Sequence, residues 1–370
     1  MQKKNRVKTI IGICDAPNTT TFRYRIYNLA RALENSAEFS LHYFYQSEIN
    51  AIADYIPNIS ALLISRTPWT WEIQNIATVA RAFGIPVIFD IDDYIFDLNA
   101  IPLLSSTLNV RLNSTHEYNH WAAHVGRFEM TANLADFFTA TNPYLGEKLG
   151  HKFGKPFFCI ENSLNQEQIA ISQRICEVKK QAKSDGNFVI GYFSGTPSHI
   201  NDFKIITSEI IRLLDNYPTM KLLVVGFMNF PQEINPYISA GRVITHPLVD
   251  FFELQILMAQ VDVSIVPLVD NIFTNCKSEL KFFEGAIVDV PTCATPIYSY
   301  SQSIQHEKTG FLCRQGQWYS TIAKIYEGKY DLKKICAGAK EYCLKHYGVS
   351  YLRKQAEAVY AQITSENKAD

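Results

Sequence analysis

The chain has 370 residues, 47% of them hydrophobic and 19% charged, and a formal net charge of −1. This length exceeds what one hydrophobic core usually supports, so we expect two domains. The composition argues against extended disorder, and the small net charge gives no general attraction to nucleic acid. No apolar run is long enough for a membrane-spanning helix, and TIIGIC (9–14) is too short for a signal-peptide core. We therefore expect a cytoplasmic protein, and peripheral contact with the inner face of the membrane stays open.

Apolar runs rich in Val, Ile and Phe alternate with segments of helical period in the first half of the chain. Continuous apolar strands separated by helices predict a parallel sheet that helices cover on both faces. The expected strands are 9–16, 39–46, 61–66, 86–92, 136–141 and 156–162, and the expected helices are 23–35, 71–84, a region near 113–133, and 143–154.

The charged run EVKKQAKSDGN (177–187) interrupts this alternation, which predicts a linker there. The alternation then restarts, so we expect two doubly wound, Rossmann-like α/β domains, 1–165 and 188–345, that face a cleft and are joined by a linker, 166–187. The expected strands of the second domain are 188–195, 220–227, 242–247, 261–268 and 292–297, and the expected helices are 200–216, 251–260, 277–288, 317–328 and 331–365, with a break at Tyr347-Gly348.

The eight cysteines form no CxxC pair, and most lie in apolar segments. This pattern favours reduced, buried thiols over a disulfide framework or a zinc ribbon.

The segment KSELKFFEGAIVDVPTCATP (277–296) carries the most informative functional pattern. It predicts a helix with Lys277, Lys281 and Glu284 along one stripe. A cation at the helix start can hold phosphate, and a carboxylate two turns later can accept ribose hydroxyl protons, which suits a nucleoside diphosphate. An ordinary amphipathic helix with a solvated charged stripe is the alternative.

Other strands also end in polar residues, where ligands of parallel sheets bind. Strand 188–195 leads into SGTPSH (194–199), in which Gly195 permits close approach and Thr196 can bond phosphate; a plain turn with a helix cap explains it equally well. Strand 86–92 ends in DIDD (90–93), whose carboxylates could bind a metal, abstract a proton or bond sugar hydroxyls. A loop cap is the alternative there.

Arginines near the same sheet edge predict an anion or partner carboxylates. Arg23 and Arg25 lie at a helix start, where cations oppose the helix dipole. Asp92 and Asp93 are candidate partners, and a single structural ion pair is the alternative. Arg66, at the end of strand 61–66, repeats the pattern more weakly.

Residues 116–124, HEYNHWAAH, contain the HExxH spacing of zinc proteases, with His124 one turn later. The motif lies between the units of a parallel sheet, and no other protease feature accompanies it. We therefore expect no metal site, and we prefer His120 or His124 as a substrate ligand that faces the cleft.

Several of these segments together resemble the GT-B glycosyltransferases, and within them the retaining group 1, or family 4-like, enzymes. The resemblance rests on ADFFTATNPYLGEKL followed by FFCIENSLN, on FVIGYFSGTPSHINDF, and on DVSIVPLVDNIFTNCKSELKFFEGAIVDVPTCATP. It covers nearly the whole chain. The motifs RYR, DxDD and KSxxKFxE are similar to those of a divergent bacterial branch.

This resemblance implies transfer of a sugar from a nucleotide-diphosphate sugar to a hydroxyl of a glycan or lipid-linked, cell-surface acceptor. It implies retention of configuration and no obligatory metal or other cofactor, and a C-terminal helix, 346–370, that packs back on the first domain. The implied catalytic residues are Asp92, Asp93 and Lys277; the implied donor-binding residues are Gly195, Thr196, His199, Lys277, Ser278, Glu279 and Glu284; and the implied acceptor-side or phosphate residues are Arg23, Arg25, Arg66 and His120.

Departures from the family pattern leave alternatives open. The E-x7-E pattern has Cys276 where its first glutamate is expected, and His199 and Lys204 lie where a basic pair usually follows strand 188–195. A catalytically silent GT-B-like partner subunit, a sugar-nucleotide epimerase of the same fold and a zinc hydrolase therefore remain as alternatives. The DID triplet also resembles the metal-binding DxD of the unrelated GT-A enzymes.

Overall fold

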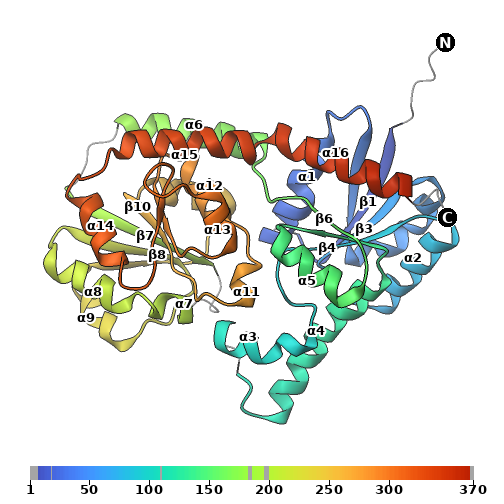
Figure 1. The fold of residues 1–370 in the computed structure, drawn as a ribbon, viewed down its shortest axis with the longest axis horizontal. Coiled ribbons are helices and arrows are strands. Elements are labelled where there is room, and N and C mark those ends of the chain that lie inside the picture. Colours follow the sequence, from blue (N-terminus) through green and yellow to red (C-terminus); the bar gives the residue numbers. More distant parts are fainter. Residues whose placement is uncertain (1–6, 18, 109–110, 182–185, 196–199, 367–370) are drawn as a thin grey trace.

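Two six-stranded sheets form the framework of the computed structural model, which describes residues 7–17, 19–108, 111–181, 186–195 and 200–366. The strand orders are β2-β1-β3-β4-β5-β6 and β12-β11-β10-β7-β8-β9, and all neighbouring strands are parallel. Figure 1 shows the two sheets side by side, each with helices around it. This architecture confirms the predicted pair of doubly wound α/β domains.

The strands follow the apolar runs of the sequence closely. Every residue of β3 and β4 is buried, as expected for central strands that are covered on both faces. Only β12 was not predicted, because two residues give no periodicity. The first sheet contains β1 (Lys8–Cys14), β2 (Phe39–Tyr45), β3 (Ala61–Ser65), β4 (Val87–Ile91), β5 (Phe137–Ala140) and β6 (Phe157–Cys159); the second contains β7 (Phe188–Gly195), β8 (Met220–Gly226), β9 (Val243–His246), β10 (Val263–Val266), β11 (Thr292–Ala294) and β12 (Phe311–Leu312).

Helices of the first domain begin with an unusual element. The predicted helix 23–35 starts as a π-helix, η1 (Phe22–Tyr27), and continues as α1 (Asn28–Leu33). The others are η2 (Gln46–Ala51), η3 (Ala53–Asn58), α2 (Trp71–Ala82), η4 (Leu98–Ala100), α3 (Ile101–Leu108), α4 (Thr115–Leu134) and α5 (Pro143–Phe153).

Several helices of the second half differ from the prediction: the expected helix 200–216 is divided in two, and residues 232–239, 272–275 and 298–303 form helices that were not predicted. Segment 166–187, expected to be a linker, is helix α6 (Gln166–Gln181) as far as Gln181, and α6 packs on α10. The predicted helix 277–288 begins only at Leu280. The others are α7 (Ile200–Lys204), α8 (Thr207–Asn216), η6 (Gln232–Ile234), α9 (Asn235–Ser239), α10 (Phe251–Ala259), α11 (Ile272–Asn275), α12 (Leu280–Ala286), α13 (Tyr298–Ser303), α14 (Trp318–Tyr326), α15 (Leu332–His346) and α16 (Val349–Glu366).

The last helix returns to the first domain, as the resemblance implied. Helix α15 ends at His346, the chain turns at Tyr347-Gly348, and α16 packs on α1. A Cβ at Gly348 would lie 2.2 Å from the carbonyl oxygen of Leu344, so the turn requires glycine. Residues Leu352, Ala356, Tyr360 and Ile363 of α16 are buried in the first domain's core. In Figure 1 α15 and α16 cross the top of both domains.

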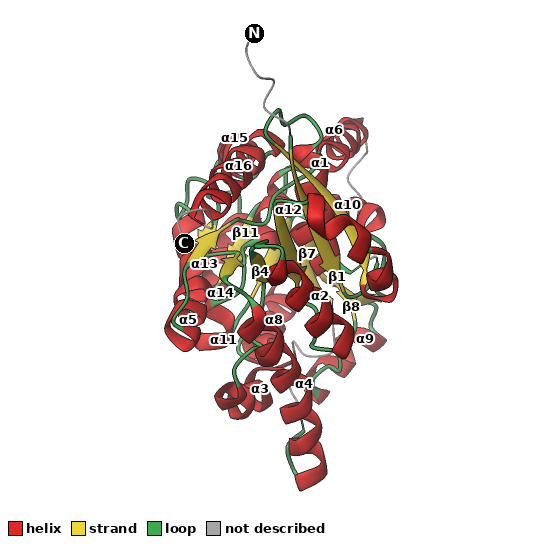
Figure 2. Cartoon of the chain, turned by 90° about the vertical axis from the view of Figure 1, so that its right-hand side faces the viewer, coloured by secondary structure: helices red, strands yellow, loops and turns green. Residues whose placement is uncertain are grey.

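Helices α3 and α4 project from the body of the molecule below the sheets, as Figures 1 and 2 both show. Helix α3 nevertheless contacts α7 and α11 of the second domain. The Asn271 side-chain amide donates to the hydroxyl of Thr107 at 2.9 Å, and the Asn201 amide donates to the Ser106 carbonyl at 2.8 Å. The two domains are therefore joined on this side as well as through α6 and α16.

Candidate functional site

A cleft of about 970 Å³ lies between the two domains. The chain order reverses between β1 and β3 in the first sheet and between β7 and β10 in the second. Ligands of doubly wound sheets bind at such switch points, beyond the carboxyl ends of the strands. The cleft has this position: residues 20–21 and Arg66 follow β1 and β3, and residues 192–194 and 265–268 belong to the ends of β7 and β10.

Four predicted site residues meet in this cleft. The Arg66 guanidinium lies 2.6 Å from Asp92 Oδ1 and 2.9 Å from Asp93 Oδ2. Lys277 comes from the second domain, and its Nζ lies 3.4 Å from Asp93 Oδ1. The Thr21 hydroxyl completes the cluster by donating to Asp92 Oδ2 at 3.0 Å. Two carboxylates and one cation from the ends of β3 and β4, and a second cation from the loop between α11 and α12 of the other domain, therefore face one volume.

Arg66 holds a backbone conformation that non-glycine residues rarely adopt, with φ at 41°. Its N–H donates to the carbonyl of Asp90 at 2.7 Å. Burial lowers the pKa of Arg66, but Asp92 and Asp93 outweigh that effect and hold the pKa above its ordinary value. A strained, permanently charged arginine at a cleft wall is typical of a functional site.

First-domain asparagines position Lys277, and the sequence analysis did not single them out. The Asn142 amide donates to the carbonyls of Cys276 and Lys277 at 3.0 and 3.2 Å. The Asn162 amide donates to the hydroxyl of Ser278 at 2.9 Å, and Ser278 lines the cleft. Asn142 follows β5 and Asn162 follows β6 of the first sheet. Their position just after strand ends is the sequence feature that could have identified them as site residues.

Cys276 does not line the cleft. Its side chain is fully buried in a core cluster made mostly of first-domain residues, and burial raises the pKa of its thiol well above the ordinary value. At the position where the family pattern has a sugar-contacting glutamate, this chain has an apolar contact between the domains.

Glu284 is buried behind the cleft wall rather than exposed on it. Its Oε1 accepts a hydrogen bond from the Tyr24 hydroxyl at 2.7 Å, and its Oε2 lies 2.9 Å from Nζ of Lys281. Lys281 and Tyr300 line the cleft, and the charge of Glu284 reaches Tyr300. Residues 24 and 284 are 260 positions apart, and sequence reasoning gave no signal for their contact.

Arg25 has a structural role, and the prediction that it contacts acceptor or phosphate is wrong. Its guanidinium forms two bonds with Asp90, at 2.5 and 3.1 Å, and two more with the Ile160 carbonyl and Asn162. Both members of the ion pair are almost fully buried. Burial lowers the pKa of Arg25, and the charge of Asp90 overcomes this and raises it.

The DxD metal pair is not formed either, because Asp90 points away from the cleft. Its carboxylate also accepts hydrogen bonds from the hydroxyls of Ser65 and Thr139, at 2.9 and 2.7 Å. Among the described residues no three His, Cys, Asp or Glu side chains gather as a group that could hold a metal ion. The HExxH residues His116 and Glu117 line the outer part of the cleft on α4.

Arg23 lies outside the cleft lining. Its guanidinium carbon stacks 3.5 Å from the ring centroid of Phe251, the first residue of α10, and therefore contributes to the contact between domains. The predicted residues Thr196 and His199 lie outside the described part of the chain. Gly195 is the last residue of β7, and a register irregularity between Phe193 and Gly195 marks this strand end.

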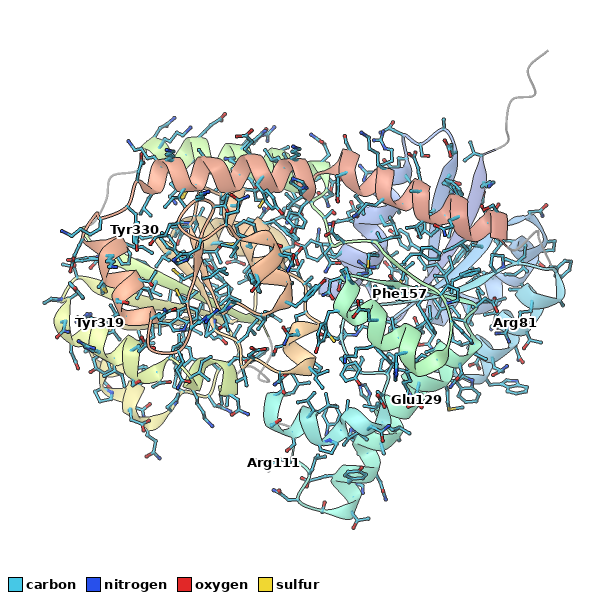
Figure 3. The ribbon with its side chains drawn as sticks, in the orientation of Figure 1. Arg81, Arg111, Glu129, Phe157, Tyr319 and Tyr330 are labelled. Carbon is cyan, nitrogen blue, oxygen red and sulfur yellow. The ribbon has the colours of Figure 1, made fainter. Side chains whose placement is uncertain are left out.

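Helix α4 supplies an aromatic wall to the cleft. Trp121 is half-buried between His120 and His124, with ring centroids at 6.0 and 5.5 Å and nearly perpendicular planes. Burial lowers the pKa of His124, and the charge of Arg66 acts in the same direction, so this imidazole is neutral at neutral pH. Arg111 lies near the end of α3 at the outer part of the cleft (Figure 3).

Glu279, predicted to bind the donor, is the N-cap residue of α12 and is buried. Burial raises the pKa of its carboxyl from 4.5 to about 7, and a hydrogen bond with Tyr347 only partly offsets this. The folded protein therefore keeps a proton that the unfolded chain releases near pH 4.5, so stability falls as the pH rises through this window.

We expect Glu279→Gln to remove this dependence. Wild-type protein should lose free energy of unfolding as the pH rises from 4.5 to about 7, and the glutamine variant should lose less of it. Urea unfolding at several pH values measures the difference, with the exposed Glu34→Gln as the control. Parallel curves for wild type and Glu279→Gln would contradict the prediction.

Solved structures of similar shape match nearly the whole chain. The structure of HepE (Alr3699) from Anabaena in complex with UDP has a TM-score of 0.64 and 14% identity, over 96% of this chain and 100% of that chain. Sucrose-phosphate synthase from Thermosynechococcus elongatus has a TM-score of 0.61 and 12% identity, over 97% and 100%. The catalytic domain of starch synthase IV from Arabidopsis thaliana, bound to ADP and acarbose, has a TM-score of 0.64 and 11% identity, over 97% and 99%.

This chain has the GT-B fold. At these identities the likeness is one of fold. No family model matches the chain, and a search of the curated proteins finds no match to its sequence. Among the described helices of this GT-B chain, none combines the length and the apolar character needed to cross a membrane.

Proposed function

We propose that the protein is a glycosyltransferase that moves a sugar from a nucleotide-diphosphate sugar to a hydroxyl of a glycan or lipid-linked, cell-surface acceptor, with retention of configuration. The observation that carries this proposal is the cluster of Arg66, Asp92, Asp93 and Lys277 at the strand ends of a GT-B cleft. Structures of the same fold were solved with UDP, with UDP-glucose and with ADP. A nucleoside diphosphate is therefore the ligand we assign to this cleft.

The cluster suits the charge changes of sugar transfer. Cleavage of the donor leaves negative charge on the diphosphate, and the cations of Arg66 and Lys277 would stabilise it. Asp92 or Asp93 would orient the acceptor hydroxyl, and the departing phosphate would accept its proton. Glu284 would accept hydrogen bonds from the ribose. The proposed mechanism has no step for a metal ion, because the cations of Arg66 and Lys277 already face the position that we propose for the diphosphate.

Turnover tests the proposed activity. Purified protein should release the nucleotide from one sugar nucleotide of a panel (UDP-, GDP-, ADP- and dTDP-hexoses), faster with an acceptor glycan than with water alone. Release should continue in EDTA. Absence of acceptor-dependent release with every donor would reject an active transferase.

The aromatic wall of α4 supports a saccharide as the acceptor. A half-buried tryptophan can stack on the apolar face of a sugar ring, while flanking imidazoles bond its hydroxyls. We expect Trp121→Ala to raise the acceptor KM about tenfold and leave the donor KM unchanged. Trp71→Ala, at an exposed position on α2, is the control. Equal changes in both KM values would contradict an acceptor role.

A silent GT-B-like partner subunit remains the second candidate. Two observations favour it: Cys276 is buried in the contact between domains, and Tyr24 holds the carboxylate of Glu284. A silent subunit would bind nucleotide or a partner without turnover, so the release assay separates it from an enzyme. The epimerase alternative predicts interconversion of two sugar nucleotides without an acceptor.

A further inference from the structure

Tyr24, a residue of the first domain, donates a hydrogen bond to Glu284, whose carboxylate the proposed function assigns to the ribose. Tyr24 lies in η1. This helix begins at Phe22, directly after residues 20–21, which line the cleft. The Tyr24 hydroxyl donates to Glu284 Oε1 at 2.7 Å, and both residues are buried. Lys281 bonds the other oxygen. In this arrangement each oxygen of Glu284 already accepts a hydrogen bond, and the side chain is only 5% exposed.

The surroundings hold Tyr24 in the second domain's core. Its ring packs edge-on against Phe283 of α12, with centroids 5.9 Å apart, and it belongs to the same buried cluster as Phe283 and Ala286. Burial raises the pKa of the Tyr24 phenol well above its usual range, and the nearby Glu284 charge adds to this. The phenol is therefore a neutral donor, suited to the bond with a carboxylate.

The hydroxyl of Tyr24 has a second partner at hand. The side-chain amide of Gln168, on α6, lies 3.2 Å from it through Nε2. The other atom of that amide, Oε1, is buried and has no partner among the described residues. Rotation of the amide would let Oε1 accept the phenol proton once Glu284 is bonded to another donor.

The backbone beneath Tyr24 is also suited to rearrangement. Helix η1 is π-helical, and the Asn28 N–H donates to the carbonyl five residues earlier, at Arg23. Such geometry is rare and is frequently found at functional sites. Residues 20–21, which line the cleft, directly precede this π-helix.

We propose that Tyr24 competes with the ribose of the donor for Glu284, so that nucleotide binding requires this contact between the domains to break. The proposal rests on the proposed function and concerns the same site. It makes Tyr24 a residue that sets donor affinity through Glu284. The apparent affinity for nucleotide is then the intrinsic affinity multiplied by the fraction of molecules in which this contact is broken.

Titration calorimetry of the full chain with UDP, ADP, GDP and dTDP tests this competition. Tyr24→Phe keeps the ring against Phe283 and removes only the hydroxyl. We expect the best-bound diphosphate to bind Tyr24→Phe at least about tenfold more tightly than wild type, the scale of one hydrogen bond to a charged group.

A matched control comes from the same helix. Tyr27→Phe removes a hydroxyl that bonds a different carboxylate, Glu167, at 3.1 Å, and it should bind nucleotide as wild type does. A purely structural Tyr24 would lower stability and leave affinity equal or weaker, so the sign of the change separates the two roles.

Glu284→Gln separates a wrong account of Tyr24 from a wrong assignment of the donor site. If Glu284→Gln weakens binding while Tyr24→Phe binds no more tightly than wild type, the competition is rejected and the donor site stands. If no diphosphate binds any of these proteins, or if Glu284→Gln binds as wild type does, the assigned donor site is rejected together with the competition.

Discussion

Lys277→Ala is expected to lower the rate of sugar transfer by about two to three orders of magnitude. The Lys277 ammonium lies in the cleft beside Asp93, and Asn142 fixes its backbone from the first domain. A cation held in place before reaction stabilises the departing diphosphate without reorganisation. Steady-state kinetics of nucleotide release measures the loss, which should appear as a lower kcat and a higher donor KM, and Lys277→Arg should restore part of it.

Lys152→Ala provides the control for that experiment. Lys152 is as exposed as Lys277, at 19% against 20%, and it also has a carboxylate partner, Asp97 at 3.0 Å, and a neighbouring ring, Phe153 at 5.7 Å. It does not line the cleft. Its replacement should change stability and leave the rate within about twofold. Equal rates for the two alanine variants would remove Lys277 from the proposed mechanism.

Arg25→Met should destabilise the fold by about 3–5 kcal/mol, because it leaves the buried Asp90 carboxylate without its cation. The pair joins η1 to β4, and Arg25 also bonds the Ile160 carbonyl after β6. Urea unfolding followed by circular dichroism measures the change in the first domain. Replacing both charges, Arg25→Met with Asp90→Leu, should recover a large part of the loss.

An exposed ion pair serves as the control for the buried Arg25–Asp90 pair. Arg31 and Glu34 form an ion pair on α1 with about half of each side chain exposed. Arg31→Met should therefore cost less than about 1 kcal/mol. A cost for Arg25→Met as small as that for Arg31→Met would show that the buried pair does not stabilise the fold.

The sheets could be predicted because their strands are mostly apolar and are bounded by turn residues. All residues of β3, β4 and β10 are buried, so periodicity and turn residues sufficed to place them. Helix α6 was predicted to be a linker because it gives almost no apolar periodicity. Its buried residues are Gln168, Ser172 and Cys176, of which only Cys176 is apolar, and its C-terminal end is charged. Helix α12 begins only at Leu280, and asparagines of the first domain bond residues 276–278 instead.

The candidate site could be predicted only where it follows from sheet topology. Asp92, Asp93 and Arg66 meet because parallel strands place their carboxyl ends at one edge. Asp90 and Asp92 alternate along the chain, yet they differ in environment: β4 ends at Ile91, so Asp90 lies within the sheet beneath Arg25, and Asp92 lies beyond it. Contacts that depend on the packing of two domains have no local signature. The Tyr24–Glu284 bond is the clearest of these.

The central claim is that the cleft between the domains binds a nucleoside diphosphate. Its most direct test is a thermal-stability titration of the wild-type chain, Lys277→Ala and Lys152→Ala with UDP, ADP, GDP and dTDP, with and without EDTA. The account predicts that at least one diphosphate raises the melting temperature of wild type and Lys152→Ala, that Lys277→Ala loses most of this rise, and that EDTA changes nothing. No rise with any diphosphate, or an equal rise in Lys277→Ala, would contradict it.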